Sequence, residues 1–310
     1  MLKLGALVGP TAVGKTEISI HLAQSIGGEI ISCDSMQVYI GMDIGTAKAS
    51  MAERQKVPHH MIDIVQPDVN FTVADYQKMV KTKIHSINER ARIPILVGGT
   101  GLYYQAVVDN YDFYPMESRD AVRRKWDQIY EEKGLEYIYQ QVLRVDQDYA
   151  AIVGCNDKKR LIRALEVYEL TGQSFSDIQT RNKDTYKLAA VGLYLDRVEL
   201  YRRIDQRVDN MIAAGLVEEV VQLREKGYDL SMNSMQALGY KQVYSYLEGM
   251  LNWDETVQEI KQETRRFAKR QYTWFNKDKR IHWVNVADYP DSSHLMEKIY
   301  AFVEGQLCKM

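Results

Sequence analysis

The chain has 310 residues, with 40 Lys and Arg against 42 Asp and Glu, 45% hydrophobic and 26% charged residues. This composition is typical of a globular protein and excludes disordered and fibrous classes. No apolar run reaches the roughly 20 residues of a membrane span, so we expect a cytoplasmic chain without membrane contact. The three cysteines are too far apart to predict a disulfide framework or a CxxC metal site. They are Cys33, Cys155 and Cys308.

The first hundred residues alternate between short apolar runs and segments with helical spacing of apolar residues. The apolar runs predict buried strands, and the helical segments each end at a glycine or a polar turn. This alternation is typical of a parallel sheet flanked by helices, the α/β class. The elements expected in order are a strand at Leu4–Gly9, a helix at Glu17–Ile26, a strand at Gly28–Ser32, a helix at Val73–Asn88 and a strand at Ile93–Val97.

The character changes beyond Asp109, where residues 115–184 contain helical patterns and no convincing strand. We expect this stretch to be a helical insertion domain within a discontinuous α/β core made of residues 1–114 and 185–310. The sheet is expected to resume at Leu188–Leu195. The elements predicted after it are helices at Val198–Ala214, Val217–Lys226, Gly239–Glu248 and Asp254–Trp274, and a last strand at Ile281–Val286.

The segment GPTAVGKT fits the phosphate-loop pattern GxxxxGK[ST], directly after the first strand and at the start of the first helix. Glycines allow the backbone N–H groups to face an oxyanion, and the helix N-terminus adds a positive dipole end. Lys15 supplies a mobile cation, and Thr16 is a candidate Mg²⁺ ligand. The residues expected to bind phosphate groups are Gly9, Pro10, Thr11, Ala12, Val13, Gly14, Lys15 and Thr16.

Two polar residues are expected at the same edge of the sheet as the phosphate loop. Asp34 follows the second strand, and Thr100 follows the third, which ends in Gly98-Gly99 without the acidic residue common in nucleotide hydrolases. The carboxyl ends of parallel strands share one edge, so these groups should converge there. Asp34 could hold Mg²⁺, take a proton from a nucleophile, or cap a turn.

Several longer motifs resemble the tRNA dimethylallyltransferase (tRNA isopentenyltransferase) family in its shorter bacterial form, which lacks the zinc finger of eukaryotic members. They cover nearly the whole chain. They are GPTAVGKT, CDSMQVYIGMDIGTAK, PHHMIDI, FTVADY, VGGTGLY, NDKKRLIRALEVYELTG, GLYLDR and MQALGYKQ.

The resemblance implies transfer of a dimethylallyl group from dimethylallyl diphosphate to N6 of the adenosine 3′ of a tRNA anticodon, with release of diphosphate. Lys15, Asp34 and Thr100 would be the catalytic residues, with Asp34 acting on the N6 proton. Arg203 and Arg207 would join the phosphate loop in binding the diphosphate, and Thr16 would ligate Mg²⁺. A monomer acting on the anticodon stem-loop is expected.

Basic residues are interleaved with aromatic residues between Gln262 and Arg280, a pattern suited to phosphates and unpaired bases. An amphipathic helix with its aromatics in the core would give the same pattern. Family matches and this pattern together predict tRNA contacts at Asp34, Ser35, Met36, Gln37, Thr100, Arg123, Lys159, Arg160, Leu161, Ile162, Arg163, Gln236, Gly239, Tyr240, Lys241, Arg266, Arg270 and Trp274.

Two other enzymes and one non-enzyme fit part of the sequence. A phosphate-loop kinase of a small metabolite would share the loop and the strand-end Asp34, but it leaves the basic insertion unexplained. An isopentenyltransferase acting on free adenine nucleotides would not need the basic C-terminal stretch. An RNA-binding protein without chemistry would leave the phosphate loop and Asp34 unused.

Overall fold

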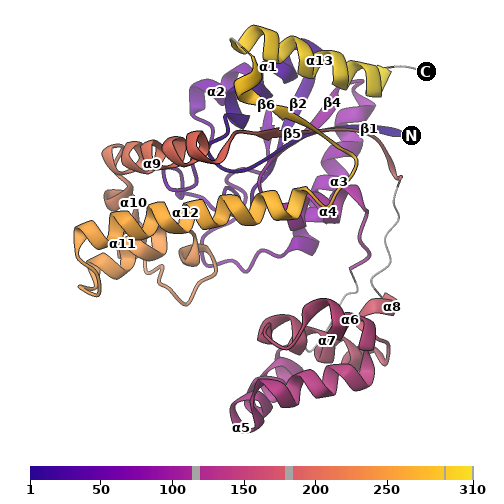
Figure 1. The fold of residues 1–310 in the computed structure, drawn as a ribbon, viewed down its shortest axis with the longest axis vertical. Coiled ribbons are helices and arrows are strands. Elements are labelled where there is room, and N and C mark those ends of the chain that lie inside the picture. Colours follow the sequence, from indigo (N-terminus) through magenta and orange to yellow (C-terminus); the bar gives the residue numbers. More distant parts are fainter. Residues whose placement is uncertain (114–118, 179–183, 290, 309–310) are drawn as a thin grey trace. The chain divides into compact units, whose positions relative to one another are not determined.

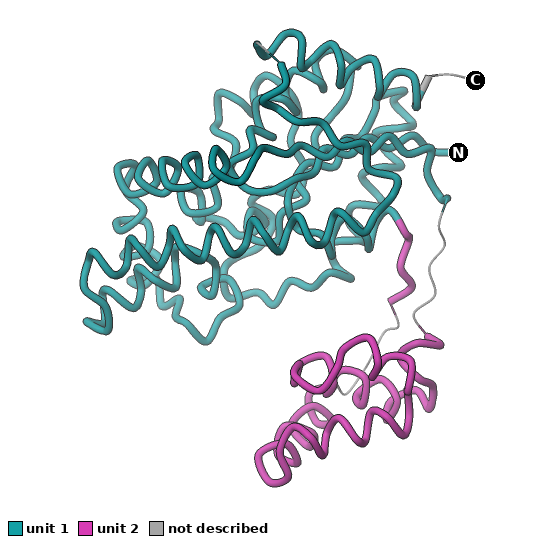
Figure 2. Tube along the Cα trace, in the orientation of Figure 1, with its two compact units in different colours: residues 1–108, 184–310 teal, residues 109–183 magenta. Residues whose placement is uncertain are grey.

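The computed structural model describes residues 1–113, 119–178, 184–289 and 291–308, and it divides the chain into two compact units. The first unit contains residues 1–108 and 184–310, and the second contains residues 109–183 (Figure 2). The sequence predicted an insertion at residues 115–184, so the compact unit begins a few residues earlier than expected.

One six-stranded sheet forms the centre of the first unit, in the order β3-β2-β4-β1-β5-β6, with every neighbouring pair parallel. The predicted α/β fold is therefore confirmed. The two edge strands are short. The strands are β1 (Leu2–Val8), β2 (Gly28–Cys33), β3 (His59–His60), β4 (Ile93–Gly98), β5 (Tyr186–Tyr194) and β6 (Ile281–Asn285).

Helices cover both faces of this sheet, which explains why its central strands are apolar on both sides. On β1, Leu7 belongs to one core, and Leu4, Ala6 and Val8 belong to the other, as the alternation of a strand requires. The first core includes α1 (Lys15–Ile26) and α13 (Ser292–Cys308), which pack together (Figure 1). The second core includes α3 (Val73–Glu89) and α4 (Gly101–Val108).

A third cluster of buried residues joins four helices with the irregular chain that follows β2. Met235 and Tyr240 are completely buried in it, next to Val38 and Met42. The long helix α12 runs beside α9 and α11 (Figure 1). The helices are α9 (Arg197–Ala213), α10 (Leu216–Glu225), α11 (Tyr240–Leu247) and α12 (Trp253–Phe275).

The second unit is helical and has its own apolar core, centred on Ile138, Val142 and Leu165. Its longest helix is interrupted at Gly134, whose backbone is not helical (φ 77°, ψ 175°). None of the helices in the described ranges of either unit is long and apolar enough to cross a bilayer. The helices are α5 (Arg119–Val145), α6 (Gln147–Val153), α7 (Lys158–Thr171) and α8 (Phe175–Ile178).

The predicted elements occur at nearly the predicted places, and the differences have physical causes. The predicted break between the helices Val198–Ala214 and Val217–Lys226 is confirmed, and Gly215 at this break has a left-handed backbone (φ 100°) directly before α10. Three helices of the first unit were not predicted, namely α4, α13 and α2 (Met51–Lys56), and neither was the short strand β3. The helix α2 begins with a capping box between Ser50 and Glu53.

The close approach of β2 and β4 at Gly98 generates a prediction. A Cβ at this position would overlap the backbone carbonyl of Cys33, and neither strand can move without losing its pairing. We expect Gly98→Ala to lower the free energy of unfolding by about 1–3 kcal/mol, measured by denaturant titration. The control is Gly305→Ala in α13, where the added methyl meets no atom within 4 Å and should raise stability by up to about 1 kcal/mol. Unchanged stability of Gly98→Ala would contradict the tight contact.

Candidate active site

The loop between β1 and α1 has the backbone conformation that an anion-binding turn requires. Gly9, Ala12 and Gly14 have positive φ values of 146°, 65° and 99°, and α1 begins at Lys15. A Cβ at Gly9 would lie 2.5 Å from the carbonyl oxygen of Leu193, so this position accepts no side chain. The strand–loop–helix arrangement is the one that presents N–H groups and a helix N-terminus to phosphate groups.

The ammonium of Lys15 lies within this loop and is removed from water. Its Nζ donates to the carbonyl oxygens of Gly9 (3.0 Å) and Pro10 (2.7 Å). Burial and the positive charge of Arg207 lower the Lys15 pKa to about 7, although Asp34 and Cys33 oppose the shift. Near neutral pH the lysine is therefore close to its midpoint of protonation, and an anion beside it would favour the charged form.

Asp34 and Thr100 are brought together at the ends of β2 and β4. The backbone N–H of Thr100 donates to the Cys33 carbonyl (3.1 Å), and its hydroxyl accepts from the N–H of Ser35 (3.0 Å). Asp34 Oδ1 accepts from the N–H of Met36 (2.8 Å), so the carboxylate caps the turn as one interpretation expected. Its Oδ2 takes part in no hydrogen bond among the described residues and is available to a ligand.

Two adjoining cavities of about 310 and 600 Å³ meet at this edge of the sheet. Residues of the phosphate loop, including Lys15 and Thr16, line the first, together with apolar side chains such as Ile30 and Val97. Thr100 and the segment around Gly239 line the second. The residues that line both cavities are Thr11, Asp34, Thr46, Arg207 and Phe267. Asp34 therefore lies where a group bound in one cavity can meet a group bound in the other.

The two arginines predicted to bind diphosphate differ in the structure. Arg207 lines both cavities, and burial lowers its pKa against the opposing effect of the Asp34 charge. Arg203 instead pairs with Glu199 (2.7 Å) and lines neither cavity, because it lies one helical turn away on α9. The geometry therefore supports a ligand role for Arg207 and not for Arg203.

Within the first unit, the predicted tRNA contacts fall into three groups. Those that line the second cavity are Asp34, Ser35, Met36, Thr100, Gln236, Gly239, Lys241 and Arg270. Gln37 lines the first cavity, but its amide already bonds within the chain, accepting from Ser32 and donating to the carbonyls of Thr46 and Ala47. Those that line neither cavity are Arg266, Trp274 and Tyr240.

These last three side chains differ in exposure. Arg266 is exposed and pairs with Glu263 (2.5 Å), while Trp274 is half-buried with its indole against Gly101. Tyr240 is completely buried, and its hydroxyl donates to Glu219. The expectation of an RNA contact by the Tyr240 side chain is therefore corrected, because the position faces the helical core behind the cavity.

The predicted contacts in the second unit are divided between its surface and its core. Lys159 and Arg160 are exposed on α7. Arg123 and Arg163 reach the buried carboxylate of Glu166 from two helices, at 3.2 and 3.1 Å. Leu161 and Ile162 have no exposed surface, because they lie on the apolar stripe of α7. Their side chains are core residues, which corrects the prediction that included them.

Sequence reasoning missed Gln271, which connects the two loops of the site. Its Oε1 accepts from the backbone N–H of Thr11 (2.9 Å), and its Nε2 donates to the carbonyl of Gly99 (3.0 Å). The available signal was its position on the buried stripe of α12, between Ala268 and Phe275. An amide on an apolar stripe needs hydrogen-bond partners, and here both partners belong to the active-site loops.

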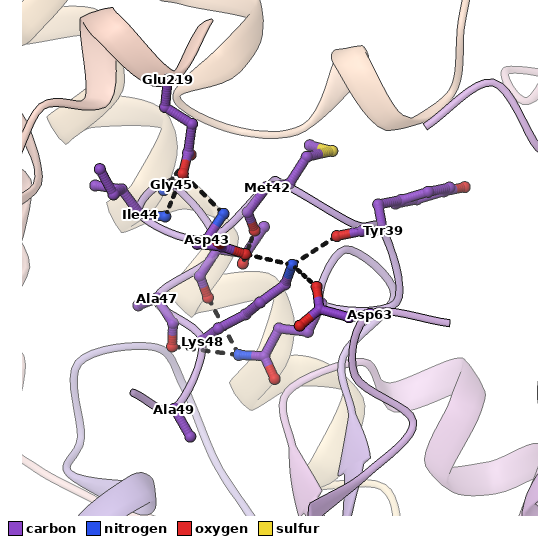
Figure 3. A network of polar contacts seen from close by, with 12 residues as sticks. Tyr39, Met42, Asp43, Ile44, Gly45, Ala47, Lys48, Ala49, Asp63 and Glu219 are labelled. Atoms are coloured by element: carbon purple, nitrogen blue, oxygen red, sulfur yellow. Dashed lines mark hydrogen bonds and ion pairs between the residues drawn. The ribbon is translucent and has the colours of Figure 1, made fainter. Parts of the chain in front are cut away.

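The irregular chain after Asp34 is also held by polar contacts. The side chain of Lys48 is 2% exposed, and its Nζ donates to the Tyr39 carbonyl (2.6 Å) and to the carboxylates of Asp43 (2.7 Å) and Asp63 (2.5 Å) (Figure 3). These contacts order a loop that contributes Thr46 and Ala47 to the first cavity.

Comparison with known proteins assigns the family. A family profile described as IPP transferase matches residues 37–278. The chain belongs to this family. A tRNA dimethylallyltransferase of Syntrophomonas wolfei is 62% identical over 306 residues, which are 99% of each chain. The resemblance stated from the sequence motifs is confirmed, and the chain is a prenyl transferase.

Solved structures agree with this assignment. The tRNA isopentenylpyrophosphate transferase of Bacillus halodurans superposes with a TM-score of 0.76 at 40% identity, covering 99% of this chain and 97% of the other. A eukaryotic dimethylallyltransferase, described as acting on tRNA, gives a TM-score of 0.79 at 28% identity over 96% of this transferase and 78% of that chain. The relatives thus share its fold over nearly its whole length.

The lowered pKa of Lys15 generates a prediction about proton uptake. Above pH 7 the free transferase loses the Lys15 proton, and a bound anion raises the pKa and restores it. At pH 8, where the phosphate groups of a diphosphate monoester are fully ionised, we expect binding of methyl diphosphate to take up close to one proton. Affinity should fall by up to about tenfold per pH unit above 7. Calorimetry in two buffers of different ionisation enthalpy measures the uptake.

The control for this measurement is Lys15→Arg, which stays protonated at every working pH. Its diphosphate binding should take up no proton and should not weaken between pH 7 and 8. Absence of proton uptake by the unaltered chain at pH 8 would contradict the assignment of Lys15 as the titrating group.

Proposed function

We propose that this transferase moves a dimethylallyl group from dimethylallyl diphosphate to N6 of the adenosine 3′ of the anticodon in tRNA, releasing diphosphate. The observation that carries the proposal is the position of Asp34, which lines both a cavity with a cationic phosphate loop and a second cavity bordered by basic residues. Membership of a family whose members are named tRNA dimethylallyltransferases supplies the substrates.

The diphosphate is proposed to bind at the phosphate loop, with the prenyl group directed into the apolar part of the first cavity. Lys15 and Arg207 neutralise the charge that develops on the leaving diphosphate. Both cations lie close to Asp34, whose charge raises their pKa values. Ile30, Ile62 and Val97 line the same cavity and provide the apolar surface that a five-carbon chain requires.

The residues present fit a magnesium ion that is held largely by the substrate. Among the described residues no group of three or more His, Cys, Asp or Glu side chains is arranged to hold a metal. The hydroxyl of Thr16 takes part in no hydrogen bond of the described residues and lines the first cavity. Mg²⁺ commonly keeps several waters and binds substrate phosphates with few protein ligands. We propose that Thr16 holds Mg²⁺, which would supply positive charge to the bound diphosphate.

In the proposed reaction, the N6 lone pair forms a bond to C1 of the dimethylallyl group as the C1–O bond breaks. The electron pair of that bond leaves with the diphosphate, and the N6 proton passes to the Asp34 carboxylate. Thr100 fixes the turn that carries Asp34 through its contact with Ser35. Because an exocyclic amine is a weak nucleophile, positioning and charge stabilisation supply most of the rate enhancement.

The tRNA is proposed to present an extruded adenosine to the second cavity, because N6 of a stacked base cannot reach an enclosed donor. Arg270 and Lys241 line that cavity, and both side chains are exposed. In the second unit, the basic residues Arg123, Lys159, Arg160 and Arg163 are proposed as further phosphate contacts. The kinase and free-nucleotide alternatives have no support among the relatives described above. The expectation of a monomer stays a prediction.

The test offers one labelled donor to competing acceptors. Dimethylallyl diphosphate labelled in the prenyl group is incubated with the transferase, Mg²⁺, unmodified tRNA and AMP. We expect label only in tRNA, and Asp34→Asn should lower turnover by about 10²-fold or more while tRNA binding changes little. Label in AMP alone would overturn the proposed acceptor. A near-normal single-turnover rate for Asp34→Asn, or its rescue by added Mg²⁺, would overturn the role of Asp34 as base.

The proposed RNA contact of Arg270 predicts a change in salt dependence. Each phosphate contact releases condensed counterions, so neutralising one should reduce the slope of log affinity against log salt by about 0.7–0.9. We expect this for Arg270→Gln in filter binding with tRNA. Arg202→Gln is the matched control, since Arg202 is exposed on α9, pairs with Glu199 and lines neither cavity. Equal slopes for Arg270→Gln and the unaltered chain would place Arg270 outside the RNA contact.

A further inference from the structure

The position of Asp34 depends on a loop that has little regular structure. Residues 34–48 connect β2 to the segment before α2, and they line the first cavity with Thr46 and Ala47 and the second with Gly45 and Thr46. Its first part is held by a parallel bridge between Tyr39 and Val65, whereas residues 42–48 contain only turns and are positioned by their specific polar contacts. We call these residues the Asp34–Lys48 loop.

Three consecutive backbone N–H groups of this loop point at one carboxylate. Glu219 of α10 accepts from the N–H groups of Asp43 (2.9 Å), Ile44 (2.8 Å) and Gly45 (3.2 Å) (Figure 3). Successive N–H groups in a turn form a concave anion-binding site, and here a side chain of the same chain occupies it. Hydrogen bonds to a charged acceptor are roughly twice as strong as neutral ones. Glu219 is therefore a principal anchor of the loop.

The same carboxylate contacts the segment on the other side of the second cavity. The hydroxyl of Tyr240 donates to Glu219 Oε1 (2.5 Å). Burial raises the pKa of Tyr240, and the Glu219 charge raises it further, so the hydroxyl remains a donor. The hydroxyl end of the ring lies against Gly45, where a Cβ would overlap Cε2 and Cζ of Tyr240. One carboxylate thus joins the Asp34–Lys48 loop to the start of α11.

The residues next to Tyr240 belong to the cavity wall. Gly239 and Lys241 line the second cavity, as do Gln236 and Ala237 of the preceding turn. Tyr240 itself faces the opposite direction, toward Glu219. A displacement of this wall segment would therefore reach the loop that begins at Asp34 through Tyr240, whose hydroxyl bonds Glu219 and whose ring contacts Gly45.

From these contacts we propose that Glu219 is a positioning residue, which couples the Gln236–Lys241 segment to the Asp34–Lys48 loop and so sets Asp34 against the acceptor. The inference rests on the proposed function, because it assigns the acceptor to the second cavity. Glu219 touches no substrate in this scheme. A misplacement of about 1 Å in a reacting group lowers the rate by about 10²-fold, so loss of this anchor should act on the chemical step.

The experiment compares single-turnover rate constants with excess transferase and saturating donor. Glu219→Gln leaves an amide whose NH₂ faces backbone donors, so the loop loses part of its anchor. We expect its rate constant to fall by about tenfold or more while tRNA affinity in filter binding changes little. Partial unfolding only lowers the concentration of active transferase, and the rate constant does not change while the active transferase stays in saturating excess over tRNA. A purely structural role would therefore leave the rate constant unchanged.

The matched control is Glu29→Gln, because Glu29 is a carboxylate of the same unit, more buried than Glu219, that pairs with His60 and Arg90 and lines neither cavity. The Glu29→Gln variant should have a lower thermal stability and an unchanged single-turnover rate constant. Equal loss of rate constant in the two variants would overturn the inference, and so would an unaltered rate constant in Glu219→Gln. Failure of the unaltered chain to modify tRNA would instead overturn the proposed function.

A double-mutant cycle tests the coupling itself. Tyr240→Phe removes only the hydroxyl, and we expect a smaller loss of rate constant than for Glu219→Gln. If the two residues act through one contact, the double variant should be no slower than Glu219→Gln alone. Additive losses would show that Tyr240 and Glu219 act independently, which would overturn the proposed coupling.

Discussion

Parallel pairing of β4 with both β1 and β2 is the constraint on which the active site depends. This pairing brings the phosphate loop after β1, Asp34 after β2 and Thr100 after β4 to one edge of the sheet. The close approach at Gly98 and the bonds of Gln271 then fix the distances between these loops. Lys15 and Arg207, both half-buried, can remain beside one carboxylate there because the carboxylate partly balances their charge.

Local sequence patterns predicted the sheet and the loops at its edge well. The phosphate loop follows a fixed spacing, and Asp34 comes directly after an apolar run, so position along the chain was sufficient information. The helix α13 was missed although Leu295, Ile299, Val303 and Leu307 repeat every four residues. The helix α4 was harder to predict from the sequence. Apolar residues occur on all sides of the segment GLYYQAVV, so no apolar face with helical spacing stands out.

The direction of individual side chains was the least predictable part of the site. Tyr240, Leu161 and Ile162 lie in segments that match family motifs for RNA contact, yet they face the core. A motif identifies a stretch of backbone, whereas helical periodicity decides which of its residues face solvent. On α12, Phe275 is buried in the core, whereas Arg270 lines the second cavity. The interpretation as an amphipathic helix therefore holds for Phe275, and the interpretation as an RNA-binding surface stays open for Arg270.

The place of β5 in the sheet has a consequence for synthesis of the chain. β1 lies between β4 and β5, and β5 becomes available only when residue 194 has been made. At a translation rate of about 5–20 residues per second, the edge of β1 that pairs with β5 stays unpaired for several seconds after β4 has been made. Meanwhile the second unit, which has its own core, can fold on the ribosome before the sheet is closed. Premature release of the chain in this interval would leave an apolar strand edge open to aggregation.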